Sequence, residues 1–217
     1  PSFIRIADDR QLYVTLETND ARAAIATVRF DSVRNRLSLV DVTPVPGLIP
    51  CHIDIDPTGC WLSCTCYGSG DVLVRATNNY TTPNKSFSAK KTHVGSSVHP
   101  IRQTQPHPHC AVFSPQGDFL LVADLGLDRV YIYPFDASFG SLGPPAIWAA
   151  PPGSGPRLLS FSADGRFVLL VSELSSEVSC LAWRSGQLLE ICRESARISD
   201  AERDNTAAGL RWNSNGR

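Results

Sequence analysis

The sequence has no methionine and only five histidines. It also lacks several sequence patterns that would assign the protein to a functional class. No run approaches the roughly 18 to 20 apolar residues that a membrane-spanning helix requires, and no stretch has the pattern of a signal peptide. The net charge is −1, and Lys90 and Lys91 form the densest basic run. We therefore expect no nucleic-acid partner, no membrane partner and a cytoplasmic location.

The cysteine pattern is also limited. The seven cysteines include no C-x-x-C pair, so neither a zinc ribbon nor a secreted disulfide framework is indicated. Cys60, Cys64 and Cys66 are separated by even numbers of residues, so in a strand their side chains would lie on one face. We predict that these thiols are buried. A G-x-S-x-G nucleophile motif is absent. With 42% hydrophobic and 19% charged residues, the composition is that of a globular protein.

Internal repetition is the main signal that is present. Four segments align: "PSFIRIADDRQLYVTLE", "PCHIDIDPTGCWLSCTCYG", "PHCAVFSPQGDFLLVADLG" and "PRLLSFSADGRFVLLVSEL". In the last three, a proline is followed nine residues later by a turn glycine (Gly59, Gly117 and Gly165), and the first copy has Asp9 in that place. A fifth turn begins at "NSNGR". The turns are separated by 50, 58, 48 and 51 residues.

Each repeat has the pattern strand, turn, strand. Segments such as "HIDID" and "AVFS" precede the turns, buried strands such as "FLLVA" follow them, and third strands are expected at "DVLV", "DRVYIY" and "EVSCLAW". We therefore predict an all-β fold, a β-propeller with about four blades. A sandwich would not show such copying. The expected organisation is one domain, residues 1–217, with repeats at 1–49, 50–107, 108–155 and 156–206 and a fifth starting at 207–217.

Equivalent positions in a propeller form a ring around the axis. The position after the leading proline holds Ser2, Cys51, His109 and Arg157, and the position after the second strand holds Glu17, Tyr67, Leu125 and Glu173. If the blades were only scaffold, the residues at these positions would be small or apolar. Several of them are polar instead, and we expect these polar side chains to converge at one mouth of the channel.

The long step of 58 residues places surplus chain in residues 74–106, which show no strand pattern. Long loops in compact domains are usually functional or disordered, and this one ends in "RQTQPHPH". We expect a binding loop over the axis. Residues 194–204 are the only polar helical candidate, and we expect a loop there.

These motifs resemble the lactonase family of seven-bladed β-propellers, which includes 6-phosphogluconolactonases and 3-carboxy-cis,cis-muconate lactonizing enzymes. The matching stretches include "PCHIDIDPTGCWL", "YGSGDV", "RQTQPHPHC", "SPQGDFLLVADLGLDRVYIY", "GSGPRLLSFSADGRF" and "SELSSEV". The resemblance implies seven blades, so four and part of a fifth make this chain a fragment. The start at Pro1 likewise leads us to expect upstream sequence. An incomplete ring would leave open sheet faces and could be inactive or unstable.

Carried over by motif, the family's site falls on His109 in "PHPH", Arg157 in "GPR" and Glu173 in "SEL", with Arg102 in "RQ" at the cleft. A further family arginine would lie beyond Arg217. The chain departs from the family at Leu158, where histidine is frequent, and at Cys66, where asparagine is common. These departures bear on substrate identity and on activity.

The chemistry expected from this resemblance is hydrolysis of a sugar lactone, with 6-phosphogluconolactone favoured. His109 would be the general base, Glu173 the acid or an orienting partner, and Arg157, Arg102 and His107 would hold a small anionic substrate. Carboxymuconate cyclisation is an alternative reaction, in which the same residues would have different roles. A propeller that serves as a non-enzymatic scaffold is the alternative class of function.

Each candidate also has a structural reading. His109 would hydrogen-bond backbone, Arg157 and Glu173 would form ion pairs, and His99 and His107 would be loop residues. Asp124 and Asp128 are expected to be turn and packing residues. "HPH" points its two imidazoles to opposite faces and no carboxylate is interleaved, so we expect no metal and no cofactor. The oligomeric state is left open.

Overall fold

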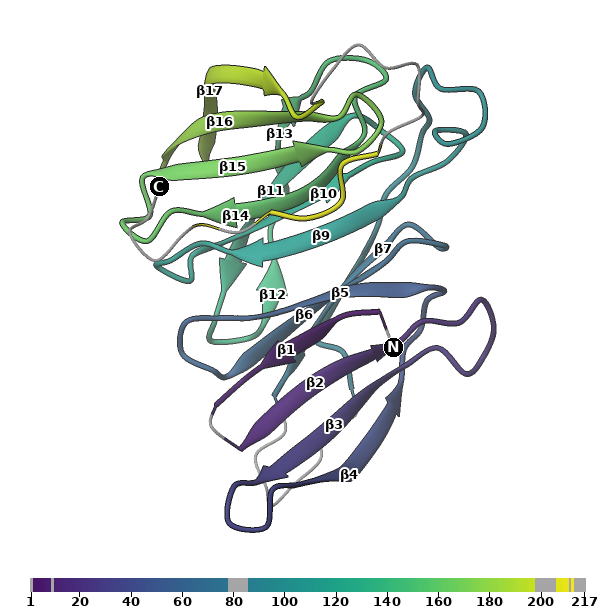
Figure 1. The fold of residues 1–217 in the computed structure, drawn as a ribbon, viewed down its shortest axis with the longest axis vertical. Helices are drawn as coiled ribbons and strands as arrows, with labels where there is room; N and C mark the ends of the chain where they lie inside the picture. Colours follow the sequence, from purple (N-terminus) through teal and green to yellow (C-terminus); the bar gives the residue numbers. More distant parts are fainter. Residues whose placement is uncertain (1, 9, 78–85, 198–205, 211, 213–217) are drawn as a thin grey trace.

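The protein folds into four antiparallel β-sheets that stand side by side in chain order (Figure 1). The fold is seen in a computed structural model that describes residues 2–8, 10–77, 86–197, 206–210 and 212. These residues contain no helix, and so none that could cross a membrane. The prediction of an all-β propeller with four blades is confirmed.

The sheets are the blades, and within each the strands follow one another from the innermost outward. Blade 1 contains β1 (Ile4–Ile6), β2 (Gln11–Leu16), β3 (Ala24–Asp31) and β4 (Arg36–Pro44). Blade 2 contains β5 (Pro50–Ile55), β6 (Trp61–Cys66), β7 (Asp71–Ala76) and β8 (Ala89–Thr92). Blade 3 contains β9 (Pro108–Phe113), β10 (Phe119–Asp124) and β11 (Arg129–Asp136), and β11 pairs with both β12 (Ser141–Leu142) and β13 (Ala146–Ala149). Blade 4 contains β14 (Pro156–Phe161), β15 (Phe167–Ser172), β16 (Glu177–Arg184) and β17 (Gln187–Ser195).

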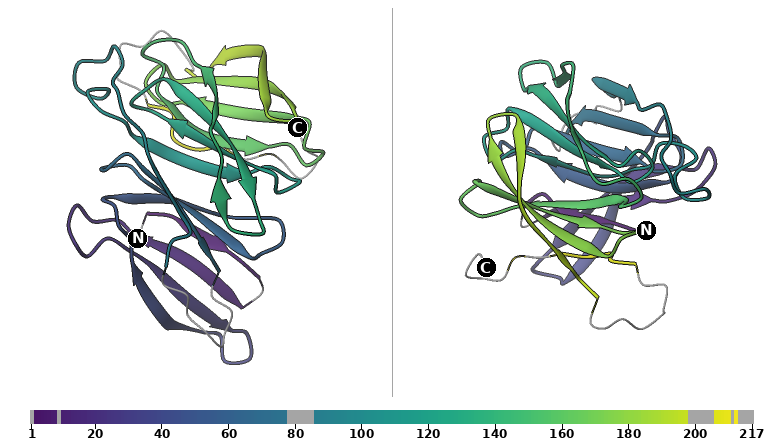
Figure 2. Two further views of the ribbon diagram at one scale, coloured as in Figure 1. Left: turned by 180° about the vertical axis from the view of Figure 1, so that it is seen from behind. Right: turned by 90° about the horizontal axis from the view of Figure 1, so that it is seen from above.

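Apolar side chains between neighbouring sheets form the core. One cluster joins blades 1 and 2 around Tyr13 and Ile53, a second joins blades 2 and 3 around Val72 and Phe113, and a third joins blades 3 and 4. Burial of both faces explains why the second strands, such as "FLLVAD", have nearly continuous apolar sequences. Figure 2 shows the resulting stack from two further sides.

The turn between the first and second strand is the same in three blades. Gly59, Gly117 and Gly165 have φ angles of 73°, 74° and 69°, and each amide donates to the carbonyl three residues earlier at 2.9 Å. A side chain is disfavoured at such positive φ, which explains the repeated glycine. The equivalent first and fifth turns, at Asp9 and residues 213–217, lie outside the described residues.

Two loop predictions are wrong in part, because each segment contains residues of an edge strand, and edge strands need no apolar pattern. Residues 74–106 contain β8, which is half-exposed, carries Lys90 and Lys91 and, within the described part of the chain, pairs only with β7. Residues 194 and 195 belong to β17, the outermost strand of blade 4; residues 198–204 lie outside the described residues. Backbone hydrogen bonds to one neighbour are enough to hold such strands. A third prediction fails at Cys60, which is exposed before β6, whereas Cys64 and Cys66 are buried.

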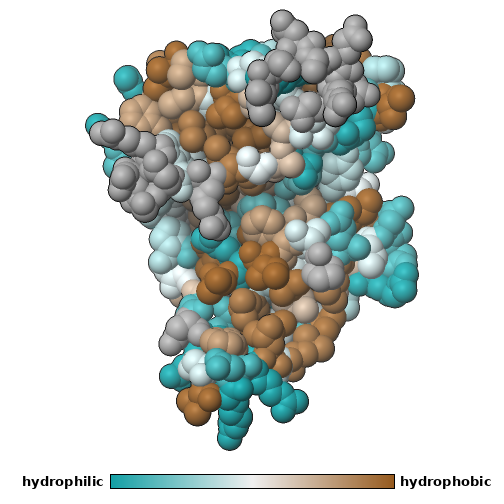
Figure 3. Space-filling model, viewed as in Figure 1, coloured by the Kyte–Doolittle hydropathy of each residue, from teal (hydrophilic) through white to brown (hydrophobic). Residues whose placement is uncertain are grey.

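The outer face of blade 1 has no neighbouring sheet among the described residues. Ile4, Ile6, Leu37 and Leu39 are each 58–66% exposed, and Figure 3 shows apolar residues gathered over this sheet. On the free side of blade 4, residues 206–210 run along β14 (Figure 1), and the indole of Trp212 donates to the Ser160 carbonyl at 3.4 Å.

Candidate active site

A cavity of about 340 Å³ opens where the first strands of all four blades begin. Its walls include the four residues that follow the leading prolines, namely Ser2, Cys51, His109 and Arg157, and also Glu17. The predicted convergence of equivalent positions is therefore confirmed for this set. The remaining lining residues are Phe3, His52, Leu158 and residues 208–210.

A β-bulge aims three of these side chains. In blade 3, Pro108 pairs with Asp124 and Cys110 with Ala123, so His109 is the extra residue in its strand. The same register shift occurs at Cys51 in blade 2 and at Arg157 in blade 4. A bulge inserts an unpaired residue and redirects its side chain, and bulges are common beside active sites. The repeat therefore copies a backbone irregularity that turns these positions toward the axis.

Glu173 joins the two candidate arginines. It follows β15 directly, and its carboxylate is 6% exposed. Oε1 accepts a hydrogen bond from Arg102 Nη2 at 2.6 Å, and Oε2 accepts one from Arg157 Nη1. Arg157 lines the cavity beside His109. The structure thus brings together His109, Arg157, Glu173 and Arg102, which the family resemblance predicted as one set from separate segments.

The loop that carries Arg102 is held by polar contacts within the loop and to blade 3. His99 Nδ1 accepts from the Arg102 amide at 3.1 Å, and the Gln103 side chain donates to Leu125 O at 2.8 Å and to Asp128 Oδ1 at 2.7 Å. A Cβ at position 126 would lie 2.0 Å from Gln105 O, so only glycine lets the loop approach blade 3 this closely. This loop contributes Arg102 to the site.

Burial and charge determine the protonation of the site. Burial is the largest influence on His109 and, with the positive charge of Arg157, lowers its pKa to about 4. Burial acts to raise the pKa of Glu173, but the Arg102 hydrogen bond and the Arg157 charge outweigh it, so the pKa lies below its usual range. At neutral pH the site therefore holds a neutral imidazole beside an ionised carboxylate and two guanidinium groups.

The two aspartates of "ADLGLDR" have structural roles, as predicted. Asp124 is fully buried, and its Oδ2 lies 2.6 Å from His93 Nδ1. Asp128 Oδ2 accepts from Gly153 N and Oδ1 from Gly155 N, at 2.7 and 2.8 Å. His93 follows β8 of blade 2 and packs against blade 3, where its ring is stacked on Tyr131.

His107 does not line the cavity. It is 8% exposed, its Nδ1 donates to Tyr67 O at 2.8 Å, and its ring is stacked on the Tyr67 ring with centroids 4.0 Å apart. Substrate binding by His107 stays a prediction, and the side-chain contacts described above are to Tyr67.

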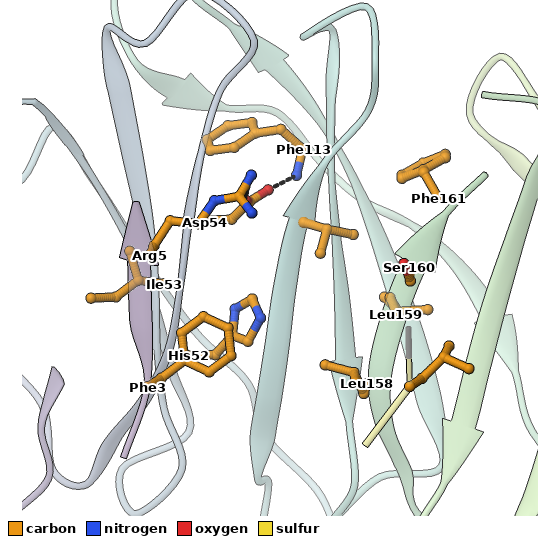
Figure 4. Close-up of a pocket in the computed structure, with 12 residues that line it drawn as sticks. Phe3, Arg5, His52, Ile53, Asp54, Phe113, Leu158, Leu159, Ser160 and Phe161 are labelled. Carbon is orange, nitrogen blue, oxygen red and sulfur yellow. Dashed lines mark hydrogen bonds and ion pairs between the residues drawn. The ribbon is translucent and has the colours of Figure 1, made fainter. Parts of the chain in front are cut away.

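His52 was missed by the sequence analysis. It forms a wall between the first cavity and a second one of about 370 Å³ further along the same strands, and burial lowers its pKa to about 3. Figure 4 shows the second cavity, with Arg5, Asp54 and Phe113 at its polar end. Arg5 Nη2 lies 3.0 Å from Asp54 Oδ1. The alternation in "HIDID", which places His52 and Asp54 on one face of β5, was the available signal.

Among the described residues, no three His, Cys, Asp or Glu side chains are grouped as metal ligands. This observation does not test whether the protein binds a metal, so the expectation of no metal stays a prediction.

The chain belongs to the lactonase family of seven-bladed β-propellers, because the family model described as "Lactonase, 7-bladed beta-propeller" matches residues 1–217. It is 27% identical to a 6-phosphogluconolactonase of Bacillus subtilis, covering 95% of this chain and 58% of the relative. It is 30% identical to a 6-phosphogluconolactonase of Formosa agariphila, covering 86% and 54% of the two chains. The chain thus spans a little over half the length of these relatives.

Solved structures agree with this assignment. A periplasmic gluconolactonase of Pseudomonas aeruginosa superposes with a TM-score of 0.89 at 30% identity, covering 100% of this chain and 63% of that one. A putative 6-phosphogluconolactonase of Bacteroides fragilis superposes with a TM-score of 0.83 at 27% identity, covering 93% and 58%.

Proposed function

We propose that the protein is a lactonase that hydrolyses 6-phosphogluconolactone to 6-phosphogluconate. The observation that carries the proposal is the pairing of Glu173 with both Arg102 and Arg157 beside a neutral His109. Membership of the lactonase family and the names of two relatives support it. The two guanidinium groups fit a small anionic substrate.

In the proposed reaction, His109 takes a proton from a water molecule while the water oxygen bonds to the lactone carbonyl carbon. The guanidinium of Arg157 stabilises the oxyanion of the tetrahedral intermediate. When the intermediate collapses, the bond between the carbonyl carbon and the ring oxygen breaks, and His109 returns its proton to that oxygen. The products are a hydroxyl group and a carboxylic acid, which ionises to the carboxylate by releasing its proton to solvent, and no other reactant is needed.

Glu173 fits the role of orienting partner better than that of acid. Its carboxylate accepts from both arginines and its pKa is lowered, so it carries no proton to donate at neutral pH. A lowered pKa is the opposite of what a general acid at neutral pH requires. Glu173 therefore holds Arg157 and Arg102 at the edge of the site.

The proposal is tested by following lactone loss above spontaneous hydrolysis for 6-phosphogluconolactone and for unphosphorylated gluconolactone, with carboxymuconate assayed in parallel. We expect the phosphorylated lactone to be preferred. His109→Ala and Arg157→Ala should lower kcat/KM at least about a hundredfold, whereas Arg166→Ala, which removes an exposed arginine of the same blade, should not. Activity on carboxymuconate alone, or on none of the three, would refute the proposal.

We also propose a cytoplasmic location, supported by seven free cysteines that include the exposed Cys60 and Cys192. Fractionation of cells tests it, and recovery of the protein outside the cytoplasm would contradict it.

A further inference from the structure

Tyr67 contacts two members of the candidate site although it does not line the cavity. Its ring meets the His109 ring edge to face, with centroids 5.6 Å apart and planes at 78°. Its hydroxyl accepts from Arg102 Nη2 at 3.5 Å, and the same nitrogen donates to Glu173 at 2.6 Å. One side chain in the turn after β6 thus links the candidate base of blade 3 to an arginine of the loop.

His107 supports Tyr67 from behind. The two rings are nearly parallel, with planes at 11°, and the imidazole donates to the tyrosine's own carbonyl. The backbone of His107 is itself fixed, because its amide donates to the buried Asp124 at 2.8 Å and its carbonyl accepts from Leu125 at 3.0 Å. The stack therefore rests on blade 3, which also carries His109.

We propose that Tyr67 and His107 form a positioning pair that sets the orientation of His109 and Arg102. The expected effect on kcat rests on the proposed function, whereas the expected effect on the orientation of His109 does not. A ring in contact with two imidazoles has little freedom to rotate, so it limits the orientations that are open to His109. Precise placement of a base contributes strongly to rate. The pair explains why these two rings accompany the polar residues.

The pair also affects the titration of His109. The charged groups that act on His109 are Arg157, Glu173 and Arg102, and Glu17 and His52 line the same cavity. Burial is the largest cause of the low His109 pKa. Because the Tyr67 ring covers part of the imidazole, its loss should let water reach His109 and raise that pKa from about 4 toward the ordinary value of about 6.5.

The test compares two substitutions at position 67. Tyr67→Leu removes the ring; we expect the His109 pKa, followed by NMR of labelled histidine without substrate, to rise, and kcat to fall about ten- to hundredfold. The acid limb of the pH profile should move to higher pH with it. Tyr67→Phe removes only a long hydrogen bond to Arg102, so we expect KM to rise about two- to fivefold while kcat and the His109 pKa are unchanged.

The chain contains a matched control. Tyr131 is also stacked on a histidine, His93, at 3.9 Å, and its hydroxyl also accepts from an arginine, Arg129, at 3.4 Å. Tyr131→Leu and Tyr131→Phe should lower the melting temperature without moving the His109 titration or kcat. His107→Leu should act in the same direction as Tyr67→Leu, and the double variant should be no worse than Tyr67→Leu alone, because the two residues act as a unit.

The inference is overturned if Tyr67→Leu leaves the His109 titration in place, or if Tyr131→Leu moves it equally. The titration of His109 distinguishes a failure of this inference from a failure of the proposed function. A protein that hydrolyses no lactone but whose His109 responds to Tyr67→Leu would refute the function and leave the positioning pair standing.

Discussion

Replacing Glu173 with glutamine tests how the site is held together. Glutamine has the same shape, but one carboxylate oxygen becomes an NH2 group, a donor that faces a guanidinium donor. Arg157 or Arg102 then loses its acceptor. Glu173 is 6% exposed and Arg157 is 26% exposed, so water screens the contact between them little. Arg102 is 36% exposed, so its contact with Glu173 contributes less to stability.

The magnitude follows from these contacts. A hydrogen bond to a charged group contributes about 1.5–3 kcal/mol, so we expect Glu173→Gln to lower the free energy of unfolding by about that amount. If the same contact orients Arg157 toward the oxyanion, kcat/KM should fall about ten- to hundredfold, since about 1.4 kcal/mol corresponds to a factor of ten.

The pH dependence of the variant distinguishes an orienting role from an acid role. The Glu173 charge raises the pKa of His109, so its removal should lower that pKa and move the acid limb of the rate profile to lower pH. If Glu173 were instead the general acid, glutamine would abolish the alkaline limb and lower kcat by about 10²–10⁴.

Stability gives a second measurement. The folded-state pKa of Glu173 lies below its unfolded value, so the ion pairs contribute stability that is present above about pH 4.3 and is lost as the pH falls through the folded pKa. The difference in melting temperature between the wild type and Glu173→Gln should therefore shrink in acid. The control is Glu177→Gln, which changes a carboxylate of the same hairpin that accepts from Ser175. Equal melting temperatures and equal kcat/KM for wild type and Glu173→Gln would refute the reasoning.

Two further predictions concern the scaffold. Asp128→Asn should lower the free energy of unfolding by about 1.5–3 kcal/mol and raise KM, because Asp128 accepts from the side chain of Gln103, next to Arg102; unchanged urea denaturation would contradict this. Leu170→Ala, in the fully buried cluster between blades 3 and 4, should lower the free energy of unfolding by about 2–5 kcal/mol and leave the KM of the folded fraction unchanged. A loss below 1 kcal/mol would show that blades 3 and 4 pack less tightly than the structure indicates.

The sequence predicted most where the physical cause is local. A glycine with positive φ occupies the turn of three blades, and buried second strands must be apolar, so both repeat visibly. β8 was missed because an edge strand with one paired neighbour carries lysines as readily as apolar residues. Cys60 was misplaced because parity holds only within a strand, and the strand begins at Trp61.

The candidate site was predictable only as a set of residues. The repeat identified His109 and Arg157 as equivalent, and the resemblance added Glu173 and Arg102. The sequence held no sign of the bulge at His109 and Arg157, because a bulge is a mismatch between two strands and neither strand alone encodes it.

By itself, the order of residues determined the repeat, the turns and the buried strands of this propeller, because those features depend on neighbours within a few positions of the chain. Tertiary structure alone decided that one carboxylate, Glu173, would join arginines from two segments, and that His109 would be neutral. Those properties arise from burial and from charges brought together across blades, and their energies depend on distance in space rather than on separation in sequence.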